Sequence, residues 1–117
     1  MTPPEHPFLD ERPSLVLAFR GEVVFWKGPA PFHFIAVPPA ECEEIQAVAS
    51  LVSYGWGVIP ATVQVGETTW TTSLFPRKGA YLVPVRDTVR LAEGIEVGEV
   101  IEVHLSIAIE EWSSLGR

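Results

Sequence analysis

A chain of 117 residues with a formal net charge of −7 is long enough for one domain with a hydrophobic core. The negative charge argues against nucleic acid, because proteins that bind DNA or RNA take most of their affinity from cationic contacts to phosphate. A single cysteine, Cys42, excludes a disulfide within the chain. No run approaches the roughly 20 apolar residues of a membrane span, and the opening residues lack the apolar core of a signal peptide. We therefore expect a cytoplasmic protein with no membrane contact.

The apolar residues are rich in Val, Ile, Phe and Trp and are interrupted by 11 prolines and nine glycines, which is typical of short strands joined by tight turns. We expect a flexible arm over residues 1–14, one domain over 15–110 and a tail over 111–117. The domain begins with a strand over 15–26 that bends or bulges at Gly21. A strand over 32–37 follows, and a helix over 39–51 begins at Pro39, because proline is tolerated in a first helical turn.

Further strands are predicted over 58–65, 68–75 and 80–85, and the alternation in the second of these places Trp70, Thr72 and Leu74 on one face. A short helix over 86–93 has Asp87 as its expected N-cap and Gly94 as the residue that ends it. A last strand covers 100–109, with alternate residues from Ile101 pointing inward. The predicted fold is mainly β, a small closed or split barrel of about six to seven strands capped by two short helices.

Several separated motifs carry a resemblance to a known family. They are G-W-G-V-I-P-A-T-V-Q-V-G, T-W-T-T-S-L-F-P, Y-L-V-P-V-R-D-T-V-R and G-I-E-V-G-E-V, in that order. With the first strand and the Pro38-Pro39 helix start, they make residues 15–109 similar to the small bacterial and archaeal family called domain of unknown function 1905. The resemblance implies a pseudobarrel closed by short helices, in outline like the double-split barrels, and it implies no reaction. One departure is Gly98-Glu99 where the family pattern suggests Gly-Asp.

The main candidate site is an anion pocket around Arg86 and Arg90, which lie four residues apart and so share one side of the short helix. Two guanidinium groups beside hydroxyls and an aromatic wall suit a carboxylate or phosphate. The neighbouring strand supplies these groups from Trp70, Thr72 and Ser73. The alternative is structural: the arginines pair with Asp87 and Glu93, and threonine is simply a good strand residue.

Trp56, between two glycines, is a second candidate, because glycines let a backbone approach a ligand closely and exposed aromatic residues are frequent binding hot spots. The alternative is that Trp56 plugs one end of the barrel. Metal binding by His33, His104 and Glu102 has no supporting spacing. Neither Cys42, surrounded by glutamates, nor Ser73, which lacks a Gly-x-Ser-x-Gly turn, is a convincing nucleophile.

The sequence therefore predicts a non-catalytic binding module without metal or cofactor, whose ligand is a small carboxylate or phosphate. The alternative is a protein-interaction or self-association module, possible as a homodimer, in which exposed aromatic and apolar residues form the contact. The residues expected at such a contact are Trp26, Trp112 and Val16.

Overall fold

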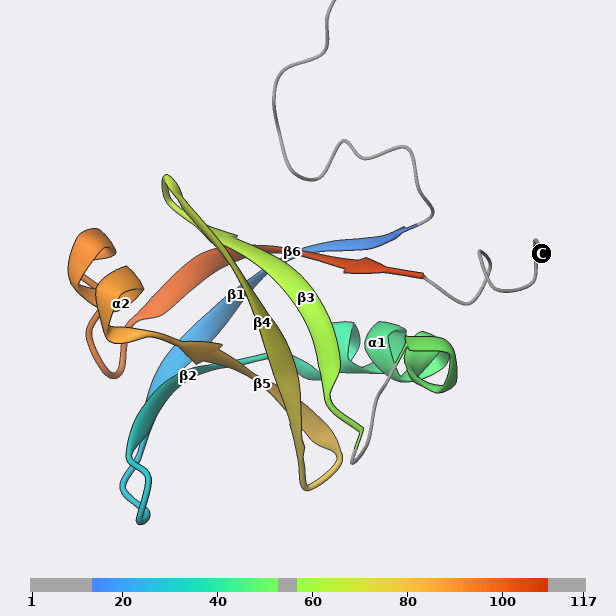
Figure 1. The fold of residues 1–117 in the computed structure, drawn as a ribbon, viewed down its shortest axis with the longest axis horizontal. Helices are drawn as coiled ribbons and strands as arrows, with labels where there is room; N and C mark the ends of the chain where they lie inside the picture. The colour runs from blue at the N-terminus through green and yellow to red at the C-terminus, as the bar shows by residue number, and fades with distance from the viewer. Residues whose placement is uncertain (1–13, 53–56, 110–117) are drawn as a thin grey trace, which may run out of the picture.

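The computed structural model describes residues 14–52 and 57–109, which form six strands and two helices (Figure 1). In chain order these are β1 (Ser14–Trp26), β2 (Phe32–Ala36), α1 (Pro39–Val52), β3 (Ile59–Val65), β4 (Thr68–Arg77), β5 (Ala80–Val85), α2 (Asp87–Glu93) and β6 (Val100–Ala108). Each predicted strand and helix is present within a few residues of its expected ends.

The strands close into a barrel in the order β1-β2-β5-β4-β3-β6, and each neighbouring pair is antiparallel. In Figure 1 the two helices lie at opposite ends of this barrel, α1 beside β3 and α2 beyond the start of β6. The prediction of a mainly β barrel capped by two short helices is confirmed. Because the barrel is closed, most of the sheet has no unpaired edge to which a strand of another chain could add.

Two strands divide the barrel into halves because each changes its partner along its length. In β1, Ser14–Glu22 pairs with β6 and Val23–Trp26 pairs with β2. In β4, the residues from Thr68 to Leu74 pair with β3, and Phe75–Arg77 pairs with β5. We call the part built on β3 and β6 half-sheet one, and the part built on β2 and β5 half-sheet two.

Gly21 lies next to the point where β1 changes partner. The strand runs unbroken through it, and Gly21 is buried in the inward-facing row with Leu17, Phe19 and Val23. A side chain there has no room: an ideal Cβ on Gly21 would lie 2.5 Å from the Ala36 carbonyl oxygen. The expected bend site is thus also a site of close packing between β1 and β2.

The core fills the barrel with the inward residues of every strand and with the buried side of α1. In β3 and β6 the inward and outward residues alternate as the sequence predicts. The residues with almost no exposed surface are Val23, Ile35, Ile45, Ile59, Val63, Leu74, Val83, Val85, Val103, Leu105 and Ile107. All of these residues are branched aliphatic, as is usual where inward side chains from all the strands fill the interior of a small barrel.

Candidate functional site

Trp70, expected as the wall of an anion pocket, is a core residue. It points into the barrel from β4 and is only 7% exposed. Its indole Nε1 donates a hydrogen bond to the carbonyl oxygen of Pro84 at 3.3 Å. That carbonyl belongs to β5, at a level where β4 pairs with β3 and not with β5. The Trp70 indole therefore bridges the gap between β4 and β5 at the boundary of the two half-sheets.

Arg86 bridges the same gap from the other side. It is exposed and precedes α2, and its Nη2 donates to the carbonyl oxygen of Thr71 in β4 at 3.4 Å. Arg86 is also the N-cap residue of α2, with extended backbone angles and no side-chain capping bond. The prediction of Asp87 as N-cap is wrong, because the chain turns one residue earlier and Asp87 lies in the first helical turn, where its charge favours the helix dipole.

Arg90 pairs with an acidic residue of its own helix, which is the structural alternative to a ligand site. Its Nη2 contacts Asp87 Oδ1 at 3.4 Å, and Glu93 accepts a hydrogen bond from Thr68 Oγ1 instead of pairing with an arginine. The predicted Gly94 terminus is confirmed: Gly94 is left-handed, with φ of 64°, and its N–H closes the helix.

The hydroxyl residues expected beside the arginines separate onto two faces. Thr72 shares the inward face of β4 with Trp70 and Leu74, whereas Ser73 is exposed on the outer face. Trp56 lies outside the described residues. The structure thus gives Trp70 and Arg86 roles in joining the half-sheets, and it does not gather Thr72, Ser73 and the two arginines around one hollow.

Cys42 lies on the first turns of α1 at the floor of a groove of about 400 Å³ between α1 and the β4–β5 turn. The thiol is buried and donates to the Val37 carbonyl oxygen at 3.3 Å. Burial raises the pKa of Cys42, and the charge of Glu41 adds to this, while a hydrogen bond from the Tyr81 backbone opposes it. A thiol that resists ionisation is a poor nucleophile, so the groove lacks a reactive group at its floor.

The raised pKa of Cys42 predicts how stability depends on pH. Its ordinary pKa is 9.0, and the folded state holds the thiol proton to higher pH than the unfolded state does. The thiol's contribution to the free energy of unfolding is therefore fully present below pH 9.0, and it is lost as pH rises through the pKa of the folded state. Tyr81, whose pKa is also raised by burial, acts in the same direction from 10.0. Urea unfolding between about pH 8 and 10.5 should show that the free energy of unfolding falls as pH rises. The fall should be shallower in Cys42→Ala. Parallel profiles for the parent and the variant would contradict the raised pKa of Cys42.

The two histidines that the structure describes, His33 and His104, belong to no metal-binding cluster of described residues. No group of at least three His, Cys, Asp or Glu side chains suited to a metal occurs in residues 14–52 and 57–109. His33 packs on Phe25 with ring centroids 4.7 Å apart. His104 Nε2 lies 3.9 Å from Glu102 Oε2, on a different strand from His33.

A different hollow forms on the outer surface of half-sheet two, between the β1–β2 and β4–β5 hairpins. It has a volume of about 420 Å³ and is mainly apolar, and we call it the aromatic groove. The residues that line it are Trp26, Ala30, Phe34, Phe75, Arg77 and Leu82. Trp26 and Phe75 are 41% and 49% exposed, which is a large fraction for two aromatic side chains that line the same hollow.

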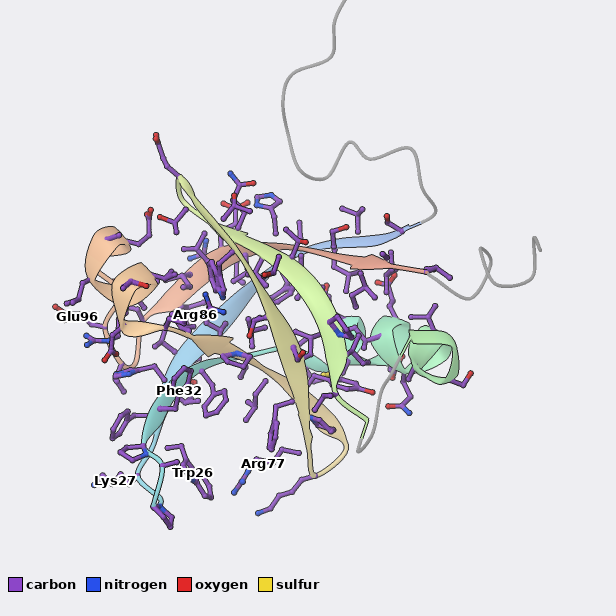
Figure 2. The ribbon with its side chains drawn as sticks, in the orientation of Figure 1. Trp26, Lys27, Phe32, Arg77, Arg86 and Glu96 are labelled. Atoms are coloured by element: carbon purple, nitrogen blue, oxygen red, sulfur yellow. The ribbon has the colours of Figure 1, made fainter. Side chains whose placement is uncertain are left out.

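Arg77 and Trp26 face one another across this groove. The Arg77 guanidinium carbon lies 4.3 Å from the centroid of the Trp26 ring, and Figure 2 shows the two side chains reaching toward each other from different hairpins. The Trp26 indole folds back against Gly28, where a Cβ would overlap the ring. Among the described residues no ion pair involves Arg77. The groove therefore holds, over an aromatic surface, one cation that has no carboxylate partner among residues 14–52 and 57–109.

Of the residues around this groove, only Trp26 is predicted from the sequence as a contact residue, and its neighbours Phe34, Phe75 and Arg77 are not. Phe32 and Phe34 alternate with the inward His33 and Ile35, so their outward direction was readable from the strand period. Their meeting with Phe75 depends on the β2–β5 and β5–β4 registers, which pair Phe34 with Pro84 and Phe75 with Leu82. No local signal specifies those registers.

The closed barrel with a helix at each end defines a small, mainly β domain of the pseudobarrel kind. A family model agrees: it matches residues 19–105 and is described as domain of unknown function 1905. The chain belongs to this family, as its motifs predict. A comparison with curated proteins found no significant match, and neither did a comparison with solved structures. No helix among the described residues is long and apolar enough to cross a membrane.

Proposed function

We propose that this protein is a non-catalytic binding module whose ligand is a planar apolar group carrying a negative charge, held in the aromatic groove. The observation that carries the proposal is the Arg77 guanidinium over the Trp26 ring, in a hollow otherwise lined by apolar side chains. Small-molecule sites combine such apolar walls with a few polar groups that fix orientation.

The chemistry of the groove matches the two halves of this ligand. The faces of Trp26, Phe34 and Phe75 offer stacking or edge contacts to a flat ring. Arg77 offers hydrogen-bond donors in a planar fork that fits a carboxylate or a phosphate. A ligand with both features would bury its ring against the aromatics and place its anion at the open end, beside Arg77.

The proposal keeps the ligand class predicted from the sequence and moves the site from Arg86 and Arg90 to Arg77. In the structure Arg86 Nη2 donates to a backbone carbonyl and Arg90 Nη2 contacts a carboxylate, so each guanidinium has a partner, although the buried Arg90 Nε has none among the described residues. The absence of a reaction and the cytoplasmic location stay predictions from the sequence.

The test compares 2-naphthoate with the neutral 2-naphthamide, using Trp fluorescence to follow binding. We expect 2-naphthoate to bind more tightly, and Arg77→Gln to weaken its binding about tenfold or more without affecting 2-naphthamide, because a hydrogen bond to a charged group contributes about 1.5–3 kcal/mol. Arg86→Gln is the matched control, since it removes an exposed guanidinium outside the groove and should leave naphthoate affinity unchanged.

Three results would reject the proposal or its site. Failure of 2-naphthoate to bind at millimolar concentration would reject the proposed ligand class. Equal affinity for the acid and the amide would remove the role given to Arg77. Loss of binding in Arg86→Gln with retention in Arg77→Gln would return the site to the position predicted from the sequence.

A further inference from the structure

We infer that the aromatic groove is one part of a larger platform that binds single-stranded nucleic acid across the outer face of half-sheet two. The inference rests on the proposed function for the groove itself and extends it to a partner class. Three observations carry it: two segments with basic but no acidic residues, a row of exposed rings, and cations at both ends of that row.

Two segments of the chain carry basic residues without acidic ones, although half of the Lys and Arg residues lie elsewhere. Residues 23–40 and 68–86, which include β2, β4 and β5 and the last part of β1, contain no Asp or Glu. The same two segments contain Lys27, Arg77, Lys78 and Arg86, and all four are exposed. Every acidic residue that the structure describes lies outside these segments. The net charge of −7 therefore hides a local cationic region, which the whole-chain argument against nucleic acid could not detect.

Phenylalanine rings form a row across the same face. Phe32 and Phe34 have centroids 5.6 Å apart, and Phe34 and Phe75 have centroids 6.5 Å apart. Trp26 pairs directly with Phe32 across β1 and β2, so it shares their side of the sheet. Proteins that bind single strands without strong sequence preference use such rings, because every base has a flat face that can stack on them.

The four cations lie at the two ends of this row. Lys27 is in the β1–β2 turn, and Arg77 and Lys78 lie at the β4–β5 turn, just before β5. Arg86 directly follows β5 at its other end, and Figure 2 shows it far from Arg77 along the sheet. Stacked bases over the rings would leave the sugar–phosphate chain to run between these ends, within reach of the cations. Arg86 would meet a phosphate with the guanidinium N–H groups that the Thr71 carbonyl oxygen does not use.

The same features argue against two other occupants. A second copy joined by a twofold axis through this face would place its cations opposite those of the first copy, because both ends of the row are cationic, and this costs electrostatic energy. A duplex would hide the flat faces of its bases, so it could use the cations but not the rings. A flexible acidic peptide could pair with the cations but has no flat bases to stack on the rings. Its binding is therefore compared with that of nucleic acid in the test below.

Binding is measured by fluorescence anisotropy of a fluorescein-labelled eight-nucleotide oligo(dT) at 50 mM NaCl. We expect saturable binding that weakens with salt with a log–log slope no steeper than about −3, since four phosphate contacts at −0.7 each give that limit. Arg77→Gln should make the slope shallower by about 0.7. Labelled poly-glutamate of equal charge should bind at least tenfold more weakly, because it cannot stack.

Phe75→Ser and Phe25→Ser form the decisive pair. Both replace an exposed phenylalanine, but Phe75 lies in the row, whereas Phe25 shares the opposite side of its strand with Val23. We expect Phe75→Ser to weaken oligo(dT) binding about tenfold or more and Phe25→Ser to leave it unchanged. Unfolding curves of both variants show whether each remains folded under the conditions of the binding experiment.

The outcomes separate this inference from the proposed function. If 2-naphthoate binds in an Arg77-dependent manner and oligo(dT) does not bind, the groove is a small-molecule site and the nucleic-acid inference is wrong. If poly-glutamate binds as tightly as oligo(dT), or Phe25→Ser weakens binding as much as Phe75→Ser, the row of rings is not a stacking platform. If neither naphthoate nor oligo(dT) binds, both proposals fail.

Discussion

Gly21→Ala is expected to lower the free energy of unfolding by about 2–3 kcal/mol, because the added methyl group has no space in the barrel. Its carbon would lie 2.5 Å from the Ala36 carbonyl oxygen and 2.6 Å from Ile35 Cγ2, both in β2. A side chain can change rotamer, but the Ala36 carbonyl belongs to the backbone of a strand that also pairs with β5. Relief therefore requires β2 to shift against two neighbours at once.

The matched control for this change is Glu22→Ala, the adjacent residue on the exposed side of β1. It should change stability by no more than about 0.5 kcal/mol, as surface substitutions usually do. Urea unfolding of the two variants, followed by Trp fluorescence, gives both values. Equal stability of Gly21→Ala and Glu22→Ala would show that β1 and β2 do not approach as closely as the structure places them.

Trp70→Phe is expected to destabilise the protein by about 2–4 kcal/mol, because it removes both a hydrogen bond and part of a buried ring. The Nε1 donor at 3.3 Å from the Pro84 carbonyl is lost, and that carbonyl faces the gap where β4 and β5 do not pair. A carbonyl left without a donor there adds a desolvation penalty to the lost volume.

Trp26→Phe provides the comparison for Trp70→Phe. Trp26 is exposed and lies on the outer side of β1, outside the packed core, so this change should leave thermal and urea stability within about 0.5 kcal/mol of the parent. Amide hydrogen exchange locates the effect of Trp70→Phe: exchange should rise first in β4 and β5. A uniform rise over the whole barrel, or similar losses in the two Trp variants, would contradict the bridging role of Trp70.

Local patterns predicted most of the secondary structure because each depends on residues that are close in sequence. The alternation in β3, β4 and β6 marked their inward faces, and Gly94 marked the end of α2. The prediction of Asp87 as the N-cap of α2 is wrong because Asp suits both an N-cap and a first helical turn, and the extended backbone angles of Arg86 at the end of β5 place the start one residue earlier.

The candidate site was harder to predict than the fold because the same side chain can either bind a ligand or make a structural hydrogen bond within the barrel. Trp70 and Arg86 have the chemistry of a ligand site, and the structure uses that chemistry on the carbonyls of Pro84 and Thr71. Which carbonyls lack a strand partner is decided by where β4 leaves β3 and joins β5. That position follows from barrel closure and not from any motif near Trp70 or Arg86.

By itself the sequence determined the secondary structure, the mainly β barrel class and the family, since strand periods, turn residues and ordered motifs are properties of neighbouring residues. Only the tertiary structure decided which face carries a binding surface. It placed Trp26, Phe34, Phe75 and Arg77, drawn from three strands, around one groove. The physical reason is register: pairing between strands distant in sequence sets which outward side chains meet, and a shift of one residue would turn each of them inward.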